Sequence, residues 1–130
     1  MFLWLSLNVF GAETPNISGV YTVISTPNSS GVNCKKKTKP ATYQWILTDS
    51  SGTLSINVQG KTVFSSLEGK ILYADGNDIA TRVSGYNKKK TALSWFTMYV
   101  DLDNNKISGT RTYINDKLSH CVYNVSGHKH

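Results

Sequence analysis

The chain is predicted to be an all-β protein, an antiparallel up-and-down meander that closes into a small barrel of about eight strands. Ser, Thr, Asn and Gly are abundant, which favours strands and turns over helices. Apolar and polar residues alternate cleanly from Thr53 to Gln59, a period that a helix cannot use. No apolar pattern follows helical spacing over the usual length of a helix. A two-sheet β-sandwich is the alternative fold.

Residues 1–12 are predicted to be part of a secretory signal peptide, and residues 13–130 a single β-barrel domain. Phe2 to Phe10 form an apolar h-region, and we expect cleavage after Gly11. The positive n-region is missing, which indicates a truncated segment or a wrong start codon. A buried N-terminal strand or helix is the alternative. The segment is too short to span a bilayer, so we expect a secreted or periplasmic, soluble mature protein.

The first half of the chain is rich in β-branched and aromatic residues, broken by Gly, Pro and Ser. It predicts strands at 18–26, 42–49, 53–59 and from 62 to about 74. The longest loop, 27–40, separates the first two strands. Gly69 is either a tight turn, which gives nine strands, or a bulge within one long strand, which gives eight.

The second half predicts a weak strand at 79–84 and then a closing meander with strands at 91–102, 106–114 and 117–125. Short Asn/Asp turns separate the last three runs. The run 91–102 is apolar on both faces, so one face fills the core. The other face lines a partner surface or covers a groove.

Two lysine clusters hold seven of the 14 basic residues, and the formal net charge is +6. Successive connections of a meander alternate between the two barrel ends. Eight strands therefore place both clusters on one rim, and nine strands place them on opposite rims. Even closure also lets the first and last strands pair antiparallel, so we predict eight strands and one basic rim. The candidate anion- or partner-binding residues are Lys35, Lys36, Lys37, Lys39, Lys88, Lys89 and Lys90.

Such a rim attracts anions, for example sulfated glycans, phosphate-rich polymers, acidic proteins or lipopolysaccharide. Lysine supplies a point charge without the bidentate geometry of Arg, so no sequence-specific nucleic-acid binding is expected. The alternative is that the lysines are solvated loop tips that keep an exported protein soluble.

Cys34 and Cys121 are the two cysteines, and their spacing fits no metal site. In an oxidising compartment we expect them to form one disulfide, which the chain-entropy model values at roughly 4 kcal/mol. Two unrelated buried thiols are the alternative. Asn16, Asn28 and Asn124 begin glycosylation sequons, which matter only in a eukaryotic host.

No catalytic motif is found, and we predict a protein that is not an enzyme and holds no cofactor or metal. Most of the acids fall in turns, where Asp is favoured for backbone reasons. Asp75 and Asp78 share a turn that does not match a calcium-binding loop. His128 and His130 bind a transition metal loosely at most.

Aromatic residues on two of the predicted strands are candidates for the mouth of a cavity. The candidate ligand-binding residues are Tyr43, Trp45, Trp95, Tyr99 and His120. The alternative for Trp45 and Trp95 is plain core packing.

Gly19-Val-Tyr21 at the start of the first strand, followed by a basic meander with one disulfide, resembles the calycin barrels, the lipocalins and avidins. Those families open with Gly-x-Trp, whereas this chain has Tyr and lacks the helix signal of lipocalins. The resemblance implies a calycin-like architecture, and no site residue is carried over. A barrel of this size is either filled by side chains or holds one small ligand.

The first functional hypothesis is an exported β-barrel that binds a small amphipathic ligand in its lumen or a partner molecule at its rim. The second is an interaction or inhibitor protein that binds an acidic protein or anionic glycan through its lysine-rich loops. An unrecognised hydrolase is a third, and an oligomer is open in each case. A cavity lined by Trp, Tyr and Thr favours the first, and a solid core beside an exposed basic or aromatic patch favours the second.

Overall fold

The computed structural model describes residues 15–28, 40–60, 62, 64–117 and 119–130. The described residues form strands and connections, with no helix among them. The strands are β1 (Gly19–Asn28), β2 (Ala41–Ser50), β3 (Thr53–Gln59), β4 (Ser66–Asp75), β5 (Asp78–Tyr86), β6 (Ala92–Asp101), β7 (Lys106–Asn115) and β8 (His120–Lys129). Within the described ranges, no helix is long and apolar enough to cross a membrane.

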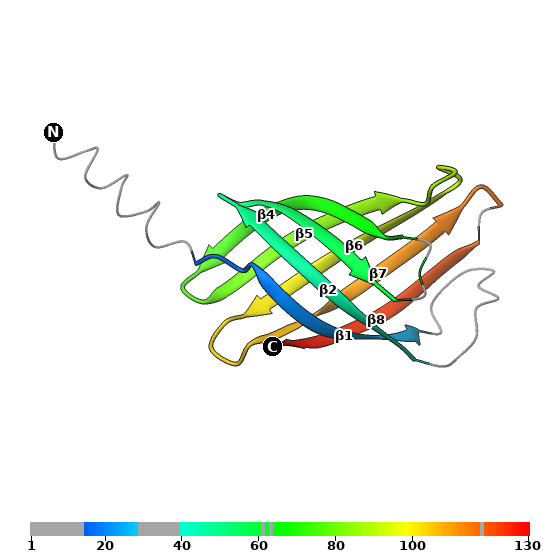
Figure 1. The fold of residues 1–130 in the computed structure, drawn as a ribbon. Coiled ribbons are helices and arrows are strands. Elements are labelled where there is room, and N and C mark those ends of the chain that lie inside the picture. Colours follow the sequence, from blue (N-terminus) through cyan, green and yellow to red (C-terminus); the bar gives the residue numbers. More distant parts are fainter. Residues whose placement is uncertain (1–14, 29–39, 61, 63, 118) are drawn as a thin grey trace, which may run out of the picture.

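Each strand pairs antiparallel with the next, and β8 pairs antiparallel with β1, so the eight strands form a closed barrel. Figure 1 shows this closure, with β1 (blue) beside β8 (red). The predicted barrel is confirmed, and the alternative of a sandwich is wrong. A closed eight-stranded meander also agrees with the calycin-like architecture that the resemblance implies.

The prediction of eight strands is confirmed because Gly69 lies inside β4, where it pairs with Val83 and Leu54. The irregularity of β4 lies between Ile71 and Tyr73 instead of at Gly69. A Cβ atom at Gly69 would collide with the backbone carbonyl oxygen of Arg82. Glycine is therefore needed here for the close approach of β4 to β5 and makes neither a turn nor a bulge.

Two predicted strands have a boundary that differs from the structure by more than two residues. β4 begins at Ser66, four residues later than expected. β8 covers His120–Lys129 instead of 117–125. It extends because its ladders with two strands continue: Lys129 lies opposite Tyr21 of β1, and His128 opposite Lys106 of β7. The sequence pattern did not predict this extension because the last residues of β8 are polar, and the pattern is weakest where hydrophobic alternation stops.

Inward-facing side chains fill the barrel, as alternation along each strand requires. Trp45 and Phe96 meet edge to face near its centre, with ring centroids 5.1 Å apart. The other large core residues are Ile17, Tyr21, Val23, Leu47, Leu54, Ile56, Val58, Phe64, Leu67, Ile79, Val83, Met98, Val100, Ile107 and Val125.

One end of the barrel, which we call the plugged end, carries the β2–β3, β4–β5 and β6–β7 turns and the start of β1. Ile17 is fully buried there. Its amide donates a hydrogen bond to Asp49 Oδ2 (3.1 Å), and its carbonyl oxygen accepts one from the Tyr21 hydroxyl (2.9 Å). Asp49 Oδ1 also accepts from the Gly52 amide (2.9 Å), so Asp49 ties the β2–β3 turn to the segment before β1.

The opposite end, which we call the loop end, carries the β1–β2, β3–β4, β5–β6 and β7–β8 connections. Lys88, Lys89 and Lys90 lie here, and all three are exposed. Asn28 and Ala41, which flank the first connection, lie at the same end. Cys34, the proposed signal peptide and the cluster Lys35, Lys36, Lys37 and Lys39 lie outside the described residues.

Candidate functional site

A group of polar side chains lies in the half of the lumen nearest the loop end, apart from Asp49 and Thr81 in the other half. Ile107, Gly109, Arg111 and Tyr113 alternate along the inward face of β7, which brings a guanidinium group into the barrel. Ser94 of β6 and Tyr123 of β8 lie inward on the two strands that flank it. Strand periodicity thus places a cation inside an otherwise apolar core.

Arg111 is held by two neighbours. Its Nη1 donates a hydrogen bond to Ser94 Oγ (3.2 Å), and its Cζ lies 4.5 Å from the centroid of the Tyr123 ring. Burial lowers the pKa of Arg111 from its ordinary value, and the only opposing influences come from Tyr123 and Tyr43. No carboxylate of the described residues is among the groups that act on it. Among the described residues, a hydroxyl and an aromatic face stabilise its charge, and no carboxylate does.

Two further donors beside Arg111 lack partners. Trp45 and Ser25 are only 3% and 4% exposed. Within the described part of the chain, neither Trp45 Nε1 nor Ser25 Oγ has a hydrogen-bond partner. Buried polar groups are nearly always satisfied in folded proteins, so both groups are available to an acceptor that enters the space beside them.

These donors share one small cavity of about 20 Å³. That volume holds a single water-sized group, such as one carboxylate oxygen. Its lining comes from six strands and the β3–β4 connection: Ser25, Tyr43, Trp45, Val58, Thr62, Phe64, Leu67, Arg111 and Val125. Thr62 and Phe64 belong to that connection, so the cavity faces the loop end. A guanidinium, an indole N–H and a hydroxyl around one space form a site for an acceptor with negative charge.

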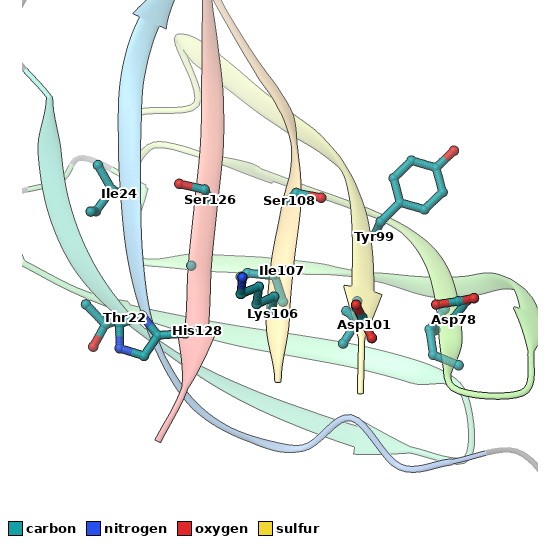
Figure 2. Close-up of a pocket in the computed structure, with 13 residues that line it drawn as sticks. Thr22, Ile24, Asp78, Tyr99, Asp101, Lys106, Ile107, Ser108, Ser126 and His128 are labelled. Carbon is teal, nitrogen blue, oxygen red and sulfur yellow. The ribbon is translucent and has the colours of Figure 1, made fainter. Parts of the chain in front are cut away.

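A larger hollow, of about 540 Å³, lies on the outside of the barrel over β1 and β5–β8. Figure 2 shows Ser126 and Ser108 between Ile24 and Tyr99, above a row that contains His128, Lys106, Asp101 and Asp78. The acids and the base in this row offset one another. The pKa of Asp101 is lowered, chiefly by a hydrogen bond from Asn104, with a smaller contribution from Lys106. This hollow contains no buried donor without a partner, so we place the candidate site in the lumen.

The structure does not bring the five predicted ligand-binding residues together. Tyr43 and Trp45 face the lumen and line the small cavity. Trp95, Tyr99 and His120 lie on the outer face, because the inward positions of β6 are those of Ser94, Phe96 and Met98. The five residues therefore form no single cavity mouth, and the part that each plays in binding stays a prediction.

The sequence did not predict Arg111 or Ser25 as residues of the candidate site. The available signal was parity: counting in twos from Ile107 puts Arg111 on the core face of its strand. The basic residues that the sequence singles out are clusters in loops, whereas Arg111 is isolated within a strand. For Ser25, a small hydroxyl at the end of an apolar strand carries no signal of its own.

Comparisons of the chain with protein-family models, curated proteins and solved structures found no match. The described residues contain no group of three or more His, Cys, Asp or Glu that is placed to hold a metal ion.

Proposed function

We propose that this protein binds a small amphipathic ligand through an anionic group, a carboxylate, that enters the loop end of the lumen. Arg111 provides the charge, and Trp45 Nε1 and Ser25 Oγ provide hydrogen bonds. The observation that supports this is a half-buried cation on which no carboxylate of the described residues acts, beside two orphaned donors. The proposed activity is ligand binding alone, without catalysis.

Energetics favour an anion over a neutral group. Each buried donor left unsatisfied costs about 1–3 kcal/mol, and a charged partner recovers more than a neutral one. A guanidinium placed where its charge is only partly compensated gains most from a carboxylate. The residual space is too small for more than the head group. The apolar remainder of the ligand therefore lies toward Tyr43 and Phe64, which line the cavity on the side of the loop end.

Export of this binding protein remains part of the proposal. It is supported by the apolar run in residues 1–12 and by the pair of cysteines. Cys121 is buried in β8 at the loop end, and Cys34 belongs to the connection that leaves β1 at this end. Their pairing would fasten that connection beside the candidate site.

The test is titration of the ¹⁵N-labelled protein with benzoate and octanoate, followed through the indole N–H signal of Trp45. Benzyl alcohol and octanol serve as uncharged matches. We expect saturable shifts of the Trp45 signal with the acids only, and their loss in Arg111→Gln. Arg82→Gln is the matched control, because Arg82 is the other arginine and lies exposed on the outer face. Equal shifts with the alcohols, or unchanged binding by Arg111→Gln, would refute the proposal.

A further inference from the structure

A shallow groove runs along the outer face of β5 and β6, away from the lumen site. Its hollow of about 500 Å³ is lined by three cross-strand pairs: Arg82 with Thr97, Ser84 with Trp95, and Tyr86 with Leu93. A second hollow of about 240 Å³ shares Tyr86 and Leu93 and reaches Lys90 in the β5–β6 connection. The two hollows therefore adjoin at Tyr86 and Leu93, and we call them together the β5–β6 groove.

The middle of the β5–β6 groove is aromatic and hydroxylated. The Tyr86 side chain is 60% exposed. Trp95 also lies on the outside of the barrel and is partly exposed. Ser84 and Thr97 place hydroxyl groups along the edges of the Trp95 position. Large rings on an outer strand face have no part in core packing, so they are available to a partner.

The charges of the groove lie at its two ends. Arg82 stands at one end and Lys90 at the other, with no cation on the residues between them. Asp116 is the one acid among the described lining residues, and it lies at the Lys90 end. The groove therefore complements an extended molecule with widely spaced negative groups.

We propose that the β5–β6 groove binds an anionic glycan whose sugars carry carboxylate or sulfate groups. The C–H face of a sugar ring packs against Trp95 or Tyr86, and the sugar hydroxyls hydrogen-bond to Ser84 and Thr97. Arg82 and Lys90 pair with acidic groups on separate sugars. This site is independent of the lumen site, since it shares no lining residue with it.

Other occupants fit the groove less well. A single-stranded nucleic acid carries a phosphate at every nucleotide, and the phosphates over Ser84, Trp95 and Thr97 would find no cation. A second copy of the chain would bring Arg82 and Lys90 against another protein of formal net charge +6. An acidic peptide would use the cations but would leave the hydroxylated edges unmatched.

The experiment measures binding of a chondroitin sulfate oligosaccharide by calorimetry, with maltohexaose as the neutral match and oligo-dT as the nucleic-acid probe. We expect binding of the sulfated glycan alone, weakening as salt rises. Trp95→Ala and Arg82→Gln should each lower the affinity about tenfold. Tyr73→Ala is the matched control, because Tyr73 is an exposed aromatic residue on β4 and lines neither hollow.

Tighter binding of oligo-dT, or a dimer that Trp95→Ala dissociates, would overturn the inference in favour of that occupant. Glycan binding that Trp95→Ala and Arg82→Gln leave intact would overturn it too, by showing that the loop lysines act alone. Arg111→Gln should bind the glycan normally, so failure of the lumen proposal and failure of this one are separable. Tyr86→Ala gives a second route should Trp95→Ala not fold.

Discussion

Arg111 places a positive charge where the fold itself has little use for one. Its contacts with Ser94 and Tyr123 offset only part of the cost of removing a guanidinium from water. A residue kept at such a cost is characteristic of a binding site, where stability is given up for function.

In carboxylate-free buffer, Arg111→Met should therefore either raise the free energy of unfolding or lower it by less than about 1 kcal/mol. Urea denaturation measures this directly. Added benzoate should stabilise the natural protein and leave the variant unaffected, because only the native site binds it. A loss of more than about 3 kcal/mol in the variant would instead assign Arg111 a structural role.

The stability of the fold should depend on pH through Tyr21, which lies toward the plugged end of the lumen. Burial raises its pKa from 10.0 to about 12, so the folded state holds this proton longer than the unfolded chain does. Its contribution to stability is fully present below about pH 10 and is lost as the pH rises toward 12.

Tyr21→Phe should be about 1 kcal/mol less stable than the natural protein near neutral pH, since it loses the hydrogen bond to the Ile17 carbonyl. The gap should close as the pH rises above about 10, and the order of the two stabilities should then reverse, because two pKa units correspond to about 2.7 kcal/mol. Paired urea titrations cancel the titration of the remaining groups. A constant gap up to about pH 11 would contradict the raised pKa.

Single residues were the hardest scale to predict from the sequence. Alternation alone identifies Leu54, Ile56 and Val58 as inward, and the structure agrees. It cannot decide which apolar face of β6 is inward, since Phe96 and Trp95 are equally suited to a core. The ladders with β5 and β7 make that choice, and they are long-range contacts that no local window contains.

At the scale of elements, Asp49 acts as a latch between the β2–β3 turn and the segment before β1. Asp49→Ala should lower the free energy of unfolding by about 2 kcal/mol, because it orphans the amides of Ile17 and Gly52. Asp49→Asn should fall between, as it keeps one acceptor oxygen. Hydrogen exchange of the Ile17 amide reports the latch itself, and Asp78→Ala, at an exposed position on β5, is the control.

The β4–β5 pair depends on Gly69. Gly69→Ala should destabilise the protein by about 3 kcal/mol, because its methyl group meets the backbone of Arg82. Gly76→Ala, in the β4–β5 turn, should cost only about 1 kcal/mol, for its positive φ with open space around it. Thermal unfolding of both variants checks the order, and equal effects would contradict the close approach.

Most elements were predicted because strands with an apolar face leave a period-two pattern. The exceptions have physical causes. Thr62, Phe64 and Ser65 belong to a run that is β-rich in composition, but they lie outside β4. Gly69 indicates either a turn or a bulge from the sequence because glycine often marks one or the other, whereas here its missing side chain allows close contact between strands.

At the scale of the whole molecule, closure followed from parity: an even meander lets β1 and β8 pair antiparallel, and they do. The same parity puts Lys88, Lys89 and Lys90 at the end where β1 leaves and β2 returns. The lumen site was not predictable in this way, since it joins residues of six strands and one connection in a single cavity.

The Cys34–Cys121 bridge stays a prediction, and its effect belongs to the scale of the whole molecule. Intact mass spectrometry without reductant should find the protein lighter by two hydrogen atoms than after reduction. Reduction should lower the free energy of unfolding by about 4 kcal/mol on the chain-entropy model. The double variant Cys34→Ser with Cys121→Ser should be insensitive to reductant, and an equal response in both proteins would reject the bridge.

The seam between β1 and β8 also determines how the barrel resists force. β1 begins and β8 ends at the plugged end, with Tyr21 opposite Lys129. Tension applied through the chain on either side of this seam pulls across the strands, so its hydrogen bonds break one after another instead of together. When the chain is pulled from both ends, β1 and β8 should therefore separate at low force. A barrel attached by one end only carries no tension across this seam and should stay folded.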